Sequence, residues 1–185
     1  ESGRLELLEG DALTFRYETL DGEYSIVANI PYYITGKFIR TVLTSTHQPK
    51  NITLVVQKEI AERIARNTKE SLLSLSVKAY GTPHYVGTIK RGSFRPQPKV
   101  DSAILVIENI SRDFFTELDE TFFFSILKAG FASKRKFLIN NLENHFDKDV
   151  LLNIFKELSI DSTVRAEDIS LSTWYKIVSA LESLS

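Results

Sequence analysis

The stretch from Tyr24 to Tyr32 reads Tyr-Ser-Ile-Val-Ala-Asn-Ile-Pro-Tyr, and it is the part of the sequence that decides the fold. Its first half, Tyr24 to Ala28, is a short apolar run with β-branched residues, which predicts a strand. Asn29-Ile30-Pro31-Tyr32 follows directly. In open α/β sheets, ligands bind beyond the carboxyl ends of strands, where loops present polar groups against a rigid base. We therefore expect this tetrapeptide to lie at the functional edge of a sheet.

Short apolar runs alternate with helical patterns from residue 4 to about residue 110, which is typical of an α/β sheet covered by helices. The other predicted strands are Arg4 to Leu8, Ile52 to Gln57, Tyr85 to Lys90 and Ala103 to Glu108. The predicted helices between them are Thr35 to Ser45, Lys58 to Asn67 and Glu70 to Tyr80, with Thr35 as an N-cap.

From residue 111 to residue 185 the strand signals stop, and the pattern predicts a separate small all-α domain. The expected helices are Thr116 to Ala129, Lys134 to Glu143, Lys148 to Leu158 and Ser170 to Leu184. Phe122, Phe123, Ile126 and Leu127 fall at helical spacing, so we interpret these aromatic and aliphatic residues as core packing rather than as a base-stacking surface.

Composition narrows the class of protein. The sequence has no apolar run near the roughly 20 residues of a membrane span and no signal-peptide pattern, so we expect a cytoplasmic protein. We also expect a monomer. Cysteine is absent, and His47, His84 and His145 are scattered without ligand spacing, so we expect no metal site.

The net charge of −1 conceals a basic middle segment. Residues 31–100 hold twelve basic and three acidic residues, whereas residues 1–30 and residues 101–185 each carry a net charge of −5. Clustered Lys and Arg favour a polyanion as partner, because binding to phosphates releases counterions. The simpler interpretation, a solvated charged face, stays open at this point.

The chemistry of Asn29-Ile30-Pro31-Tyr32 suits an amino group on a flat ring. The Asn29 side-chain oxygen and the Ile30 carbonyl would accept its two hydrogens, which leaves the nitrogen lone pair for an electrophile. Tyr32, with Tyr33 as a further candidate, would stack on the ring at about 1–3 kcal/mol per base. Four residues alone favour the simpler interpretation, a turn that carries surface aromatics.

Several motifs together resemble the KsgA-type ribosomal RNA adenine dimethyltransferases, which have a Rossmann-like methyltransferase sheet and a small helical domain. Asn29 to Tyr32 resembles the N-[LI]-P-Y motif of that family. The other matches, in the family's order and spacing, are Gly10 to Leu13 (G-D-A-L), Gln57 to Ile60 (Q-K-E-V), Phe94 to Ser102 (F-x-P-x-P-K-V-D-S), Arg135 to Leu142 (R-R-K-T-L-R-N-N-L) and Arg165 to Ser170 (R-A-E-E-L-S).

The resemblance implies S-adenosylmethionine as methyl donor and an adenine of 16S rRNA, within the small ribosomal subunit, as acceptor. Asp11, with the Ala12 backbone and Asn29, would contact the cofactor, although Asp11 alone is equally compatible with a capping role. The catalytic loop would consist of Asn29, Ile30, Pro31 and Tyr32. Tyr32 and Phe94 would enclose a target base that has left its stack.

Two basic clusters are expected to contact RNA. The first cluster lies in and just before the motif Phe94 to Ser102, the proline signature, and consists of Lys90, Arg91, Arg95 and Lys99. Lys134, Arg135 and Lys136 open a predicted helix, where cations oppose the helix dipole, and this placement favours an external anion over a role in stability. An ordinary surface helix is the alternative for the second cluster.

The sequence departs from the family pattern at its start. The glycine-rich E-x-G-x-G-x-G loop and the following acidic residue, which normally precede G-D-A-L, are absent, and the chain begins at Glu1 and contains no methionine. We therefore expect only the C-terminal part of the methyltransferase domain, residues 1–110, and poor cofactor binding by these residues alone. Ser71 to Ser76 also replaces the family's Tyr-Gly-L-S pattern.

Two other functions stay open. An Erm-type enzyme that methylates 23S rRNA shares the first motifs, but the two motifs after residue 134 favour the small-subunit substrate. A non-enzymatic RNA-binding module for ribosome assembly would explain the missing loop, whereas the complete Asn29 to Tyr32 motif favours an enzyme.

Overall fold

The computed structural model describes residues 5–184. Its centre is a four-stranded sheet in the order β1-β2-β4-β3, formed by Ser25–Asn29 (β1), Asn51–Gln57 (β2), Thr82–Ile89 (β3) and Ser102–Glu108 (β4). β1 and β2 are parallel, and β4 runs antiparallel to both of its neighbours. The four strands predicted from residue 24 onward are confirmed, with ends that differ by at most three residues.

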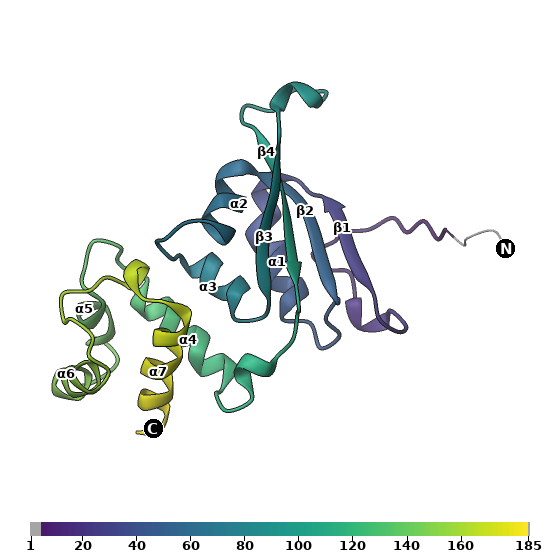
Figure 1. The fold of residues 1–185 in the computed structure, drawn as a ribbon. Helices are drawn as coiled ribbons and strands as arrows, with labels where there is room; N and C mark the ends of the chain where they lie inside the picture. Colours follow the sequence, from purple (N-terminus) through teal and green to yellow (C-terminus); the bar gives the residue numbers. More distant parts are fainter. Residues whose placement is uncertain (1–4, 185) are drawn as a thin grey trace.

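Three helices cover one face of this sheet (Figure 1): Thr35–Leu43 (α1), Lys58–Ala65 (α2) and Leu72–Lys78 (α3). Alternate residues of β2 point into this layer, and Ile52, Leu54 and Val56 are fully buried. The opposite face is more open, since Val27 on β1 is 82% exposed. Strand alternation therefore sets which side chains pack against the helices.

The predicted strand from Arg4 to Leu8 is wrong for the residues that the structure describes, and Arg4 lies outside them. Leu5 to Leu8 have no strand assignment, and Leu5 and Leu7 are more than 90% exposed. Figure 1 shows this segment leaving the body of the protein. A strand is defined by hydrogen bonds to a neighbour, and within residues 5–184 no strand pairs with this segment.

The structure corrects the predicted N-cap of α1 and the predicted start of α3. α1 begins at Thr35, but its N-cap is Ile34, and the buried Thr35 hydroxyl has no hydrogen-bond partner, so the predicted Thr35 cap is wrong. α3 begins two residues later than predicted, because Ser71 and Ser74 form a reciprocal capping box.

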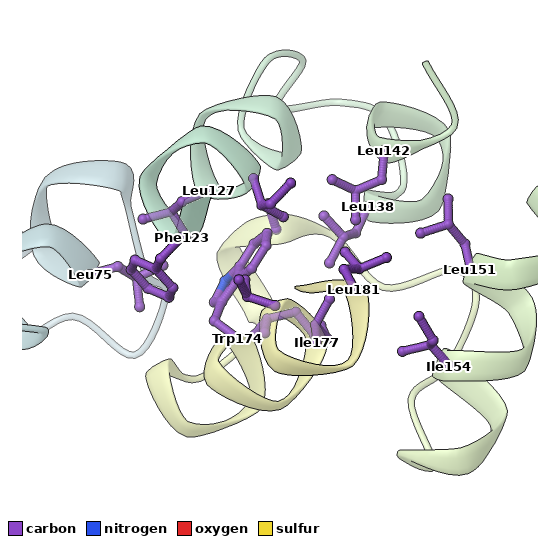
Figure 2. Close-up of a cluster of buried hydrophobic side chains, with 14 of the residues drawn as sticks. Leu75, Phe123, Leu127, Leu138, Leu142, Leu151, Ile154, Trp174, Ile177 and Leu181 are labelled. Atoms are coloured by element: carbon purple, nitrogen blue, oxygen red, sulfur yellow. The ribbon is translucent and has the colours of Figure 1, made fainter. Parts of the chain in front are cut away.

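Four helices follow the sheet: Glu120–Gly130 (α4), Leu138–Leu142 (α5), Lys148–Glu157 (α6) and Leu171–Glu182 (α7). Their apolar faces meet in a cluster around the fully buried Trp174 (Figure 2). Phe123, Ile126 and Leu127 of α4 are buried in it and Phe122 packs against it, which confirms their predicted core role. Leu75 and Ala79 of α3 belong to the same cluster, so the helices pack against the layer that covers the sheet.

Candidate active site

The residues that could bind a ligand or take part in chemistry lie at the carboxyl edge of the sheet. β1 ends at Asn29 and β2 at Gln57, while β4 starts at Ser102, which pairs with both Gln57 and Ile89 of β3. The loop between β3 and β4 therefore starts and ends at this edge, and in Figure 1 it extends away from the helices that follow residue 110. This is the end of an open sheet at which ligands bind.

Asn29 is the last residue of β1, where it pairs with Val55, and it is exposed. Within residues 5–184 its side-chain amide has no hydrogen-bond partner, so it is free to bind a ligand. Ile30, which follows, is only 8% exposed and anchors the loop in the sheet core. The strand end thus holds a rigid backbone and leaves one amide available.

Pro31 is the N-cap of a short 3-10 turn, Tyr32–Ile34, which leads into α1. The turn gives its two tyrosines different environments. The Tyr32 ring is half-buried and its hydroxyl lies 2.6 Å from Ser102 Oγ, whereas Tyr33 is 89% exposed. Of the two predicted stacking residues, the structure anchors only Tyr32.

Asp101 organises the loop that carries the proline signature. Its carboxylate accepts the Arg91 backbone N–H at 2.9 Å and contacts Lys90 Nζ at 3.4 Å, and its carbonyl accepts the Lys58 N–H at 3.0 Å. The Arg91 N–H is the main cause that holds the pKa of Asp101 below its usual value. Sequence reasoning gave Asp101 no role of its own; a carboxylate beside a loop of cations was the available signal.

A polar groove of about 570 Å³ lies beside this carboxylate, with Lys58, Arg91 and Lys99 among its lining residues. Arg95 is exposed on the same loop. Phe94 is partly buried, and no aromatic ring of the described residues lies against it, so Phe94 and Tyr32 are not in ring contact. The structure thus brings the loop cations together, but it does not stack Phe94 on another aromatic ring.

Asp11 and Ala12 lie in a turn at the exposed N-terminal side of the described chain. One carboxylate oxygen of Asp11 accepts the Leu13 N–H at 2.8 Å, and the Ala12 carbonyl accepts the Tyr17 hydroxyl at 2.9 Å. The second oxygen of Asp11 accepts no hydrogen bond from residues 5–184. This free acceptor fits the adenine amine of S-adenosylmethionine, because an amine donates hydrogen bonds and a carboxylate oxygen is an acceptor only.

Lys134, Arg135 and Lys136 lie in the turn before α5, so their predicted place in a helix is wrong. α5 starts only at Leu138, and Phe137 is its N-cap. All three cations are exposed and form no ion pair among residues 5–184. The argument from the helix dipole no longer applies, but the cluster is still available to an anion.

The structure describes no group of three or more His, Asp or Glu side chains in residues 5–184 that could hold a metal ion. Among its described helices, none has the length and apolarity that a membrane crossing requires.

Residues 1–183 match the family model described as "Ribosomal RNA adenine dimethylase". A ribosomal RNA small subunit methyltransferase A of Dehalococcoides mccartyi (strain CBDB1) is 37% identical over 177 residues, which are 92% of this chain and 61% of that protein. The chain thus spans about three fifths of the length of this curated relative.

Two solved structures share the fold. A dimethyladenosine transferase from Plasmodium falciparum superposes with a TM-score of 0.76 at 26% identity, over 95% of this chain and 71% of that one. The 23S rRNA methyltransferase ErmE has a TM-score of 0.73 at 19% identity, over 96% and 72% respectively. The sheet is therefore part of the Rossmann-like fold of these enzymes, and the chain belongs to the ribosomal RNA adenine dimethylase family.

Proposed function

We propose that this chain is part of a cytoplasmic, monomeric enzyme that dimethylates the exocyclic amino groups of two adjacent adenines in the 3′-terminal hairpin loop of 16S rRNA. The reaction belongs to the biogenesis of the small ribosomal subunit. The observation that carries the proposal is the free amide of Asn29 at the end of β1, next to the anchored ring of Tyr32.

The residues of the chain would act by holding the target adenine and the methyl donor in position. The Asn29 oxygen and the Ile30 carbonyl accept the two amine hydrogens, which draws the nitrogen lone pair out of conjugation with the ring. Tyr32 stacks on the extruded base, because an amine within a stacked helix is out of reach of the donor. S-adenosylmethionine supplies the methyl group when bound, and Asp11 with Ala12 and Asn29 would hold it. Alignment of the two reactants is the main contribution of such a site.

RNA binding would rest on two surfaces. One is the loop with Arg95 and Lys99 beside the polar groove, with Phe94 next to the target base. The other is the cluster Lys134 to Lys136, in residues 111–185, which we propose as a separate helical RNA-binding domain. In support, α4 to α7 share a buried cluster that also includes Leu75 and Ala79 from the layer over the sheet but no residue of the four strands.

The choice of 16S rRNA over 23S rRNA is supported by the relatives. Proteins named ribosomal RNA small subunit methyltransferase A are 37% identical in both Dehalococcoides mccartyi and Fusobacterium nucleatum. The 23S rRNA methyltransferase ErmE shares the fold at 19% identity.

The test is methyl transfer from labelled S-adenosylmethionine, by the complete protein, to small subunits that lack the hairpin dimethyladenosines. Reverse transcription maps the modified positions. We expect strong stops at the two adjacent loop adenines. A parallel reaction offers 23S rRNA as acceptor, and transfer to it instead of to small subunits would identify the Erm-type activity. Tight subunit binding without any transfer would identify an assembly module.

A further inference from the structure

One hydrogen bond joins the tyrosine of the catalytic loop to the start of a strand 70 residues away. The hydroxyl of Tyr32 and the Oγ of Ser102 are 2.6 Å apart, and either oxygen can be the donor. Ser102 is fully buried, and within residues 5–184 its hydroxyl has no other partner. A buried hydroxyl without this bond would be unsatisfied, so the contact is favoured by the desolvation of Ser102 itself.

The two partners differ in rigidity. Ser102 is paired in the sheet with Gln57 on one side and with Ile89 on the other. Tyr32 lies in a three-residue 3-10 turn whose N-cap has no side-chain hydrogen bond, and no other aromatic ring of the described chain packs against it. The hydrogen bond therefore ties the ring of a loop residue to a fixed point of the sheet.

We propose that Ser102 is a positioning residue that holds the hydroxyl end of the Tyr32 ring in place for stacking on the target adenine. The inference rests on the proposed function, and it adds a residue that contacts neither base nor cofactor. It also distinguishes the two adjacent tyrosines, because the exposed Tyr33 has no such anchor.

The expected effect is on turnover rather than on RNA affinity. Loss of one hydrogen bond leaves the ring present but free to rotate, so the base is held in the productive orientation for less of the time. We expect Ser102→Ala to lower kcat by about 3- to 10-fold, the size of effect expected from one neutral hydrogen bond. The Kd for the small subunit should change by less than about twofold, because phosphate contacts supply most of the affinity.

A double-mutant cycle in the complete protein tests the link. Tyr32→Phe removes the other half of the same bond and keeps the ring, so it should lower kcat by the same factor as Ser102→Ala. The double variant should be no slower than either single variant. Ser102→Thr, which keeps a hydroxyl, should restore most of the rate. Ser76→Ala removes a hydroxyl that bonds only within α3 and serves as the control.

A second readout follows the base itself. An RNA hairpin with 2-aminopurine at the target position reports by its fluorescence how closely a ring of the protein stacks on the extruded base, because such stacking quenches the emission. Ser102→Ala should bind this RNA with the same Kd but quench it less. A merely structural role of Ser102 would lower the thermal stability and leave the quenching of the folded protein unchanged.

The outcomes separate the two proposals. If the wild-type protein transfers no methyl groups, the proposed function fails. If it does, and Ser102→Ala keeps the wild-type kcat or its effect adds to that of Tyr32→Phe, only the role of Ser102 is overturned. Should Ser102→Ala not fold, Tyr32→Phe alone decides, since an unchanged kcat contradicts the inference.

Discussion

The hydroxyl of Tyr80 donates a hydrogen bond to Glu120 Oε1 across 2.5 Å, and so joins the end of the sheet-covering layer to α4. Arg112 forms an ion pair with the same carboxylate and also donates to the Thr44 carbonyl at 2.9 Å. Burial and Glu120 raise the pKa of Tyr80 well above its usual range, so the phenol stays protonated as a donor. This contact fixes the helices after residue 110 against the sheet.

We expect Glu120→Gln to lower the free energy of unfolding by about 1 kcal/mol, the difference between a hydrogen bond to a charged acceptor and one to a neutral acceptor, because glutamine can still accept from Tyr80 but carries no charge for Arg112. Urea unfolding of the variant and the wild type measures the difference. Glu157→Gln, at an exposed position of α6, is the matched control and should change stability by less than about 0.5 kcal/mol. Equal stability of the Glu120 variant and the wild type would contradict this account of the junction.

Gly130 lies in a tightly packed part of the helical cluster. A Cβ atom at this position would lie 2.4 Å from Trp174 Cη2 and 2.8 Å from Leu138 Cδ1. Gly130→Ala should therefore destabilise the protein by about 1–3 kcal/mol, as overpacking does. Gly36→Ala in α1 has open space around it and should be neutral or slightly stabilising, because alanine favours a helix. Thermal unfolding compares the two, and similar melting temperatures would contradict the prediction.

The Asp101 carboxylate should make stability depend on pH. Its folded pKa is depressed below the ordinary value of 3.8, mainly by the Arg91 N–H, so its contribution is present above pH 3.8 and is lost as the pH falls through the folded pKa. Asp101→Asn should thus be less stable than the wild type at pH 7. The difference between their free energies of unfolding should become smaller below pH 3.8. Urea unfolding across this range measures it, with the exposed Asp21→Asn as control. A gap that does not change with pH would contradict the assignment.

The local sequence predicted elements better than it predicted contacts. Strands with alternating apolar residues, such as β2, were found within a residue of their ends, because burial of one face enforces the period of two. Leu5 to Leu8 is also a short apolar run, but it is not a strand here, since a local pattern cannot supply a partner. Nothing near Tyr32 in the sequence indicated Ser102, because the two meet only through the strand order of the sheet.

Among the site residues too, some positions were predicted correctly and others were not. Asn29 was placed correctly at a strand end, because a strand followed by a proline turn leaves little freedom. The helix start near Lys134 was wrong by four residues, since Phe137 rather than a polar side chain precedes α5. Short helices with no side-chain cap carry a weak start signal in the sequence.

Asn29→Ala should reduce methyl transfer by the complete protein by at least about 100-fold, because it removes the acceptor that orients the amine. Binding to small subunits should stay within about twofold, since phosphate contacts are untouched. The assay measures kcat with labelled S-adenosylmethionine and Kd by filter binding. Asn153→Ala, on the exposed face of α6, is the control. Unchanged turnover of the Asn29 variant would remove Asn29 from the site.

The cluster Lys134 to Lys136 lies in an exposed turn without ion pairs among the described residues, so its charges are available to RNA phosphates. Its triple alanine variant should weaken binding to small subunits and reduce the slope of log K against log salt by up to about 2 to 3, since each phosphate contact contributes about 0.7 to 0.9. The control for the loss of three charges is a variant with alanine at Lys128, Lys156 and Lys176, which lie on three separate helices. Binding titrations between 50 and 200 mM salt, the range over which this release is large, give both slopes. A slope equal to that of the wild type, or an equal loss in the control, would show that the cluster is an ordinary solvated surface rather than a contact for RNA.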